Sequence, residues 1–374
     1  MIYFDNAATG GFKPHAVIDA THTVIRYLSA NPGRSGHRLS LTGAEIVYKC
    51  RETLSNFFGC KSERVIFTKN CTEALNIAIF GTLKKGDHVI CTVFEHNSVL
   101  RPLHHLKNTG IIELSIVKPD AETPLQRAIE QAITKNTRLI VCTALSNVTG
   151  EIMPIQEIAE IAKFNGALLL VDGAQAGGHV QLSVKDGISM LALAGHKGLC
   201  SIMGCGVLIL DDNVDVSPLI YGGTGSESFN LNQPLCYPEK LESGTLNLPA
   251  IASLNEGVKF VSKNIINFSQ QLTNATKLLL DGLEKMDIPC FSHPNPAGIC
   301  SFKINDIPSN EVADILNKEY DIAVRGGLHC APLTHEYLNT ANDGLVRASL
   351  AVQNSSNEIK YFLSAVGKIA KGLR

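Results

Sequence analysis

Short apolar runs and longer segments of helical periodicity alternate along most of the chain. Six runs are too short for helices and predict β-strands, at residues 64–68, 87–92, 111–117, 137–143, 167–172 and 191–194. Apolar residues that recur every three or four positions predict helices at 14–28, 42–58, 69–83, 124–133, 155–165 and 251–285. Strands that alternate with helices imply right-handed crossovers, so the pattern predicts an α/β fold with a mostly parallel sheet.

Two strand ends carry side chains suited to chemistry. The run at 167–172 is continuously apolar, as in a parallel strand covered on both faces, and it ends in Asp172. The run at 191–194 is followed by Gly195, His196 and Lys197. A lone Lys at a strand end is more often an ordinary surface residue. A carboxylate at one strand end and a partly desolvated amine at another nevertheless fit pyridoxal phosphate, which needs a protonated ring nitrogen and an amine to hold its aldehyde.

Composition narrows the class of protein. The chain has 374 residues, 45% of them hydrophobic and 18% charged, enough for a sizeable core. Its formal net charge of −2 gives no electrostatic reason to expect nucleic acid or a membrane as a partner. Its start lacks the features of a signal peptide, so we expect a cytoplasmic protein. Its 11 cysteines include no C-x-x-C pair, so neither a disulfide framework nor a metal site is predicted.

The segment 171–175 (Val-Asp-Gly-Ala-Gln), followed by Gly195-His196-Lys197, resembles the class V aminotransferase family of fold-type I pyridoxal phosphate enzymes, which includes the cysteine desulfurases. The resemblance implies a mostly parallel, mixed central sheet flanked by helices, with a smaller α+β domain. It implies a large cofactor-binding domain at 15–250. Residues 1–14 and 251–374 would form the small domain, which carries the loop of the catalytic Cys.

The resemblance also implies roles around the cofactor ring. Lys197 would bind the aldehyde covalently, and Asp172 would keep the ring nitrogen protonated. Gln175 would donate a hydrogen bond to the ring oxygen, and Asn147, in a Ser-Asn-x-x-Gly motif, would approach that oxygen or the substrate. His96 follows the strand at 87–92, and the family's Glu-His motif at this place implies that it stacks on the ring and does acid/base work.

A phosphate site is implied by three further residues. Thr72 lies at the start of the helix at 69–83, where free backbone N–H groups attract anions, and the family's T-x-x-x-T-E-x-x-N pattern fits this segment. His196 and Thr245 complete the set, and by resemblance Thr245 reaches the cofactor of a neighbouring subunit, which implies a homodimer. Family members commonly have Ser or Thr where this chain has Ala194, so one hydroxyl is absent and the affinity for the cofactor is expected to be lower unless another donor substitutes.

The segment 325–331 (Arg-Gly-Gly-Leu-His-Cys-Ala) gives one cysteine a distinctive setting. Arg325 and His329 lie close to Cys330 in sequence, and positive neighbours favour the reactive thiolate. The segment resembles the motif of the group II cysteine desulfurases, whose Cys attacks the sulfur of the substrate. Pro332 stands one residue nearer to the Cys than in many of those enzymes, which leaves the sulfur acceptor open.

Substrate contacts are implied elsewhere by the same resemblance. Arg347, in an Arg-x-Ser motif, would pair with the substrate α-carboxylate, because a guanidinium grips a carboxylate through two parallel bonds. Arg325 and Asn147 are further candidates. Ala7 belongs to the opening motif, residues 3–8 (Tyr-Phe-Asp-Asn-Ala-Ala). In the family the backbone of this motif lies along the substrate side of the site. Arg34 lies in a loop that approaches the active site, often that of the partner subunit.

The resemblance predicts that the chain converts L-cysteine to L-alanine with a persulfide on Cys330. A selenocysteine lyase acting on L-selenocysteine uses the same scaffold, and the sequence does not choose between sulfur and selenium. A class V aminotransferase or other lyase that does not use Cys330 is a second alternative, and a catalytically silent protein of the same fold is a third. A sulfur- or selenium-acceptor protein is a possible partner that the sequence does not identify.

Overall fold

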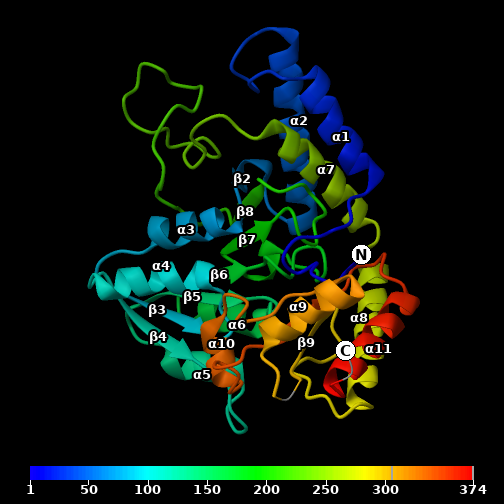
Figure 1. Cartoon of the computed structure of the whole chain (residues 1–374). Coiled ribbons are helices and arrows are strands. Elements are labelled where there is room, and N and C mark those ends of the chain that lie inside the picture. The colour runs from blue at the N-terminus through cyan, green and yellow to red at the C-terminus, as the bar shows by residue number, and fades with distance from the viewer. Residues whose placement is uncertain (305, 373–374) are drawn as a thin grey trace.

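The structure is a computed structural model that describes residues 1–304 and 306–372. A seven-stranded sheet lies at its centre, with strand order β2-β8-β7-β6-β5-β3-β4 (Figure 1). The strands of this sheet are β2 (Val65–Thr68), β3 (Asp87–Thr92), β4 (Ile112–Val117), β5 (Thr137–Thr143), β6 (Leu168–Asp172), β7 (Met190–Ala194) and β8 (Gly206–Leu210). The pairs from β7 to β4 are parallel, which confirms the predicted α/β fold with a mostly parallel, mixed sheet.

Strand β8 was not predicted from the apolar pattern. It pairs antiparallel with both β2 and β7, so it makes the sheet mixed. Its five residues are all buried, and it begins at Gly206 in the glycine-containing segment that follows Lys197.

Helices cover both faces of the central sheet. They are α1 (His15–Tyr27), α2 (Arg38–Phe58), α3 (Cys71–Thr82), α4 (Asn97–Asn108), α5 (Leu125–Ala132), α6 (Ile155–Phe164) and α7 (Leu248–Ser262), with 3-10 turns η1 (Ser62–Arg64) and η2 (Val184–Asp186). Along β5, Leu139 and Val141 pack into one core with α3 and α4. Ile140 and Cys142 pack into a second core with α2, α5, α6 and α7. This two-sided burial explains why the strands are continuously apolar.

The predicted helix at 251–285 is wrong in one respect, because the chain forms two helices there. α7 ends at Ser262, and α8 (Ile265–Glu284) begins three residues later. The amide of Asn264 caps the break by donating to the carbonyl of Phe260 at 2.8 Å. α7 packs against α1 and α2 in the second core, whereas α8 packs in a third core, so the break lets the chain pass from one core to the other.

The remaining elements are β1 (Ile2–Tyr3), β9 (Ile299–Phe302), α9 (Ser309–Tyr320), β10 (Ile322–Ala323), α10 (Pro332–Tyr337), β11 (Val346–Ser349) and α11 (Ser356–Ala370). The third core contains Phe4 and the apolar faces of α8, α9 and α11, which Figure 1 shows beside the central sheet. β1 pairs in parallel with β10, and β9 pairs antiparallel with β11. The start of the chain therefore packs with its last third, while the domain boundaries at 14/15 and 250/251 stay a prediction.

Within the described ranges, none of the helices combines the length and apolarity that a bilayer crossing requires. The cytoplasmic location stays a prediction.

Candidate active site

Asp172 and Lys197 line one cleft at the carboxyl end of the sheet. Asp172 is the last residue of β6, and β7, its parallel neighbour, ends three residues before Lys197. Both residues line the same cavity. Desolvation lowers the pKa of Lys197 below the usual lysine value, although the nearby Asp172 carboxylate acts in the opposite direction. The cleft therefore holds an amine that releases its proton more easily than an exposed lysine does.

The Asp172 carboxylate is held through one oxygen. Its Oδ1 accepts hydrogen bonds from the backbone N–H of Ala174 at 2.9 Å and from Sγ of Cys71 at 3.6 Å. Burial raises the pKa of Cys71 well above its ordinary value, so its thiol is a neutral donor. Oδ2 has no hydrogen-bond partner among residues 1–304 and 306–372, and it is left for a group bound in the cleft.

His96 stands at the start of α4 and lines the same cleft. Its Nδ1 accepts from the backbone N–H of Ser98 at 3.0 Å, which requires the neutral tautomer with the proton on Nε2. Desolvation lowers the pKa of His96, which also favours the neutral ring. The His96 side chain, by accepting from Ser98, caps the start of α4. The strand end and helix cap therefore fix the orientation of this imidazole.

The start of α3 also borders the cleft. Asn70 caps the helix by accepting from the N–H of Glu73, and Thr72 lies in the first turn beside it. Thr72 and His196 both line the cleft, together with the apolar Ala194. Free N–H groups and the helix dipole make such a helix start an anion site.

His196 precedes Lys197 and is tied to the first residues of the chain. Its Nδ1 lies 3.0 Å from Oγ1 of Thr9, and its carbonyl accepts from the N–H of Gly10 at 2.9 Å. Burial, with the charges of Lys197 and Lys13, lowers the pKa of His196 to about 4. A ring that is neutral at neutral pH can still donate one hydrogen bond to an anion.

Gln175 and Asn147 connect the cleft to distant segments. The amide of Gln175 donates to the carbonyl of Ala7 at 2.9 Å, which ties the start of the chain to a cleft residue. Ala7 itself lines an adjoining cavity rather than the main cleft. The amide of Asn147 donates to the carbonyl of His329 at 2.8 Å, which ties the predicted Cys loop to the cleft.

The Cys330 loop has an unusual backbone. His329 and Cys330 both have positive φ, at 51° and 58°, a conformation that L residues rarely adopt in succession. The Cys330 carbonyl accepts from the N–H of Asn97 at 2.7 Å, next to His96. Nη2 of Arg325 lies 3.6 Å from Sγ of Cys330. The loop is therefore held against the start of α4 with its thiol beside a guanidinium.

Two buried His side chains, His329 and His335, pack under the Cys330 loop. His329 is 2% exposed, and its Nδ1 lies 3.4 Å from Nε2 of the equally buried His335. Desolvation, with a smaller effect of the Arg347 charge, lowers the pKa of His329 to about 2. His329 thus supports Cys330 as a neutral, packed ring and not as a positive neighbour.

Arg347 is the largest fully buried side chain of the described residues, at 1% exposure. Its Nη1 donates to the carbonyl of Asn147 at 3.0 Å, and its Nη2 ion-pairs with Asp5 at 3.1 Å. Its buried Nε has no partner. A guanidinium with one free N–H at a buried position can receive an anionic group.

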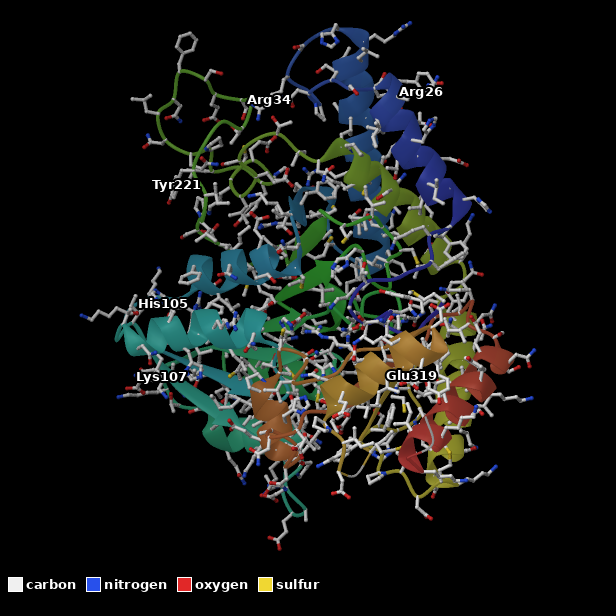
Figure 2. All side chains as sticks on the ribbon, in the orientation of Figure 1. Arg26, Arg34, His105, Lys107, Tyr221 and Glu319 are labelled. Atoms are coloured by element: carbon white, nitrogen blue, oxygen red, sulfur yellow. The ribbon has the colours of Figure 1, made fainter. Side chains whose placement is uncertain are left out.

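Two predicted residues do not join this cluster within one chain. Arg34 is exposed and donates to the carbonyl of Gly223 at 3.0 Å, and Figure 2 shows it near the start of α2, away from the central sheet. Thr245 accepts from the amide of Asn31 at 3.3 Å and lines a different cavity. The two residues share one region of the surface, and their roles in a neighbouring subunit stay predictions.

Several residues of the site were not predicted. Ser98, Cys71 and Thr143 line the cleft, and Asp5 pairs with Arg347, which donates to the carbonyl of the cleft residue Asn147. Ser98 and Asp5 could have been found from sequence, since one lies two residues after His96 and the other lies in the opening motif. Cys71 carries no such signal, because a buried Cys is usually a small core residue.

Comparisons with known proteins agree with this geometry. The family profile described as Aminotransferase class-V matches residues 2–362. A probable cysteine desulfurase of Pyrococcus abyssi is 33% identical over 389 residues, which cover 100% of this chain and 95% of that protein. A probable cysteine desulfurase of Methanothermobacter thermautotrophicus is also 33% identical, with 99% and 94% covered.

A solved structure extends the likeness to three dimensions. The apo structure of a cysteine desulfurase from Thermococcus onnurineus NA1 matches with a TM-score of 0.93 and 32% identity, covering 100% of this chain and 95% of that one. Profile, sequence and fold agree over almost the full length. The chain therefore belongs to the class-V aminotransferase family.

Proposed function

We propose that this chain is a pyridoxal phosphate-dependent cysteine desulfurase that converts L-cysteine to L-alanine and leaves the sulfur as a persulfide on Cys330. The observation that carries the proposal is the attachment of the Cys330 loop to the Lys197–Asp172 cleft. Asn147, a cleft residue, binds the carbonyl of His329, and Asn97, next to His96, binds the carbonyl of Cys330. Relatives at 33% identity named as probable cysteine desulfurases support the same activity.

The donor set of the cleft fits pyridoxal phosphate. The free Oδ2 of Asp172 suits a protonated ring nitrogen, and Lys197 is an amine with a lowered pKa. Thr72, at the start of α3, and His196 suit a phosphate group. When bound, the cofactor supplies an aldehyde that captures the substrate amine and a ring that accepts electrons from the substrate carbon.

The chain would bind and orient the amino acid through Arg347. The guanidinium is fixed by Asn147 and Asp5, so its unpartnered Nε points at a defined place. A carboxylate there gains a charge-assisted hydrogen bond in a buried setting. Lys197, with its lowered pKa, would take the α-proton as a base and return a proton to the product carbon.

Cys330 would supply the nucleophile for sulfur transfer. Its thiolate, which has Nη2 of Arg325 3.6 Å away, attacks the substrate sulfur. A sulfur–sulfur bond forms on Cys330, and the bond from sulfur to the substrate β-carbon breaks with its electron pair on carbon. A proton on that carbon gives alanine. Atoms balance, because one cysteine and one thiol become one alanine and one persulfide.

A homodimer is part of the proposal. Thr245 and Arg34 lie away from their own cleft but near each other, which suits contributions to a second copy of the chain. The domain division at 14/15 and 250/251 is also proposed, with the small domain carrying Cys330. An acceptor protein would then remove the sulfur.

The test is alanine release by the purified chain supplied with pyridoxal phosphate. L-cysteine should give alanine, and mass spectrometry should find one extra sulfur on Cys330. Cys330→Ala should abolish release while keeping the visible absorbance of the bound cofactor. Cys236→Ala, a change at an exposed cysteine, is the matched control and should behave as the unmodified chain.

Other outcomes identify the rival functions. A much higher rate with L-selenocysteine than with L-cysteine would assign the chain as a selenocysteine lyase. Full turnover by Cys330→Ala would favour an aminotransferase or another lyase. Absence of cofactor absorbance together with absence of activity would refute the proposal and leave a silent protein of the same fold.

A further inference from the structure

Ser98 lies between two residues of the cleft that the proposed function uses separately. Its Oγ is 2.8 Å from Oγ1 of Thr72 and 2.9 Å from Nδ1 of His96. All three residues line the cavity that holds Asp172 and Lys197. The hydroxyl of Ser98 therefore joins the phosphate end of the cleft to the imidazole in one hydrogen-bonded chain.

The fold explains why this hydroxyl is in place. Thr72 is the second residue of α3 and Ser98 the second residue of α4, so the two helix starts meet at the cleft. Each start presents free backbone N–H groups. The strand end that faces them offers only the methyl group of Ala194. Thr72 and Ser98 therefore supply two hydrogen-bonded hydroxyl groups beside Ala194, which has none.

The protons of the chain can be assigned. Nδ1 of His96 accepts the backbone N–H of Ser98, so it carries no proton and the Ser98 hydroxyl can also donate to it. Ser98 Oγ can then accept from Thr72. When Thr72 instead donates to a phosphate oxygen, the Ser98 proton is free to turn toward Thr72. The number of hydrogen bonds that Nδ1 of His96 accepts thus depends on whether Thr72 donates to Ser98 or to a phosphate.

We propose that Ser98 is a positioning residue that couples the phosphate end of the cleft to His96, and that it replaces the hydroxyl absent at Ala194 by holding Thr72 in its donating position. The inference rests on the proposed function, since it concerns the same cofactor site. It adds a residue that neither touches the reacting atoms nor belongs to a motif of the site.

The first test needs no cofactor. Histidine-selective NMR of the full chain, with His96→Gln to assign the signal, reports the tautomer and pKa of His96. Other charges that act on His96 are Asp172, which raises its pKa, and Lys197, Arg325 and Arg347, which lower it. They are unchanged in Ser98→Ala, so loss of the hydroxyl donor should raise the pKa of His96 measurably.

Two variants serve as controls. Ser98→Thr keeps a hydroxyl and should retain the titration of the unmodified chain. Ser356→Ala removes an exposed serine at the first residue of α11 and should leave His96 unchanged. An unaltered His96 titration in Ser98→Ala would overturn the proposed coupling.

The second test measures pyridoxal phosphate affinity by equilibrium dialysis with Ser98→Ala, Thr72→Val and the double variant. Ser98→Ala should weaken binding roughly two- to ten-fold, the effect of one net hydrogen bond. In the Thr72→Val background the same change should cost less, because its partner is gone. Equal costs in both backgrounds would refute the link between Ser98 and Thr72. If the unmodified chain does not bind the cofactor, the proposed function is refuted. The NMR titration of His96 would still test the coupling through Ser98, because it needs no cofactor.

Discussion

Arg347 and Asp5 form an ion pair in which Nη2 lies 3.1 Å from Oδ1, although the two residues stand at opposite ends of the chain. The arginine is 1% exposed and the aspartate side chain 22% exposed, so the pair lies at the inner edge of the site. Burial lowers the pKa of Arg347, and Asp5 opposes that effect. Asp5 therefore keeps a buried guanidinium charged without using its Nε.

Arg347→Lys should lower kcat/KM for L-cysteine roughly 30- to 150-fold, because about 2–3 kcal/mol of charge-assisted hydrogen bonding is lost. An ammonium is a point charge and cannot hold Asn147, Asp5 and a substrate carboxylate in fixed directions. Steady-state alanine formation measures the change. Arg101→Lys, at an exposed position of α4, is the control and should have no effect. Unchanged kinetics in Arg347→Lys would rule out a carboxylate contact.

Arg325→Gln should slow alkylation of Cys330 by iodoacetamide several-fold at neutral pH. Nη2 of Arg325 lies 3.6 Å from Sγ of Cys330, so the guanidinium holds the sulfur in place and offers it a positive partner during attack on the reagent. Peptide mass spectrometry follows the rate at Cys330 and, as an internal reference, at the exposed Cys236. Equal rates at Cys330 in both chains would show that Arg325 does not activate the thiol.

Glu95→Gln should stabilise the protein at alkaline pH. Burial raises the pKa of Glu95 from 4.5 to about 8, its Oε1 accepts from Thr92 and Thr143, and its Oε2 has no partner. Between these two pH values the folded chain holds a proton that the unfolded chain has lost, so the free energy of unfolding falls as pH rises. The full shift in the pKa of Glu95 corresponds to a loss of roughly 4–5 kcal/mol in the free energy of unfolding at alkaline pH.

Denaturant unfolding at pH 5 and pH 9 measures the effect. Wild type and Glu95→Gln should be similar at pH 5, where Glu95 is protonated in the folded state, and should diverge at pH 9 in favour of the variant. Glu113→Gln on β4 is an exposed control and should follow wild type at both values. If the free energies of unfolding of wild type and Glu95→Gln differ by the same amount at pH 5 and pH 9, the raised pKa of Glu95 is contradicted.

Co-expression of Lys197→Ala and Thr245→Ala chains should give a mixed dimer that is more active than the dimer of either variant alone. If Thr245 serves the neighbouring site, a mixed dimer contains one site with an intact Lys197 and an intact partner threonine. That site should turn over L-cysteine at the wild-type rate, giving about half of the activity of a wild-type dimer. Differently tagged chains allow the mixed dimer to be purified. If Thr245 acts within its own chain, the mixed dimer has one dead site and one impaired site, and its activity is about half that of the Thr245→Ala dimer.

The apolar pattern and the order of motifs were enough to predict the α/β fold and the meeting of Asp172 and Lys197. Parallel strands deliver their carboxyl ends to one edge, so residues that follow adjacent strands must lie together. The pattern did not separate α7 from α8, since both have helical periodicity and only the core that each one faces differs.

Local sequence by itself determined most strands and helices of the central sheet and which chemical groups follow them, because hydrophobic periodicity and capping act over a few residues. The tertiary structure alone decided that Ser98 bridges Thr72 and His96, that Cys71 holds Asp172, and that Arg347 is fixed by Asn147 and Asp5. Each of these contacts, except the one between Ser98 and His96, joins segments far apart in the chain. Their geometry depends on how whole helices and strands pack, which no local pattern encodes.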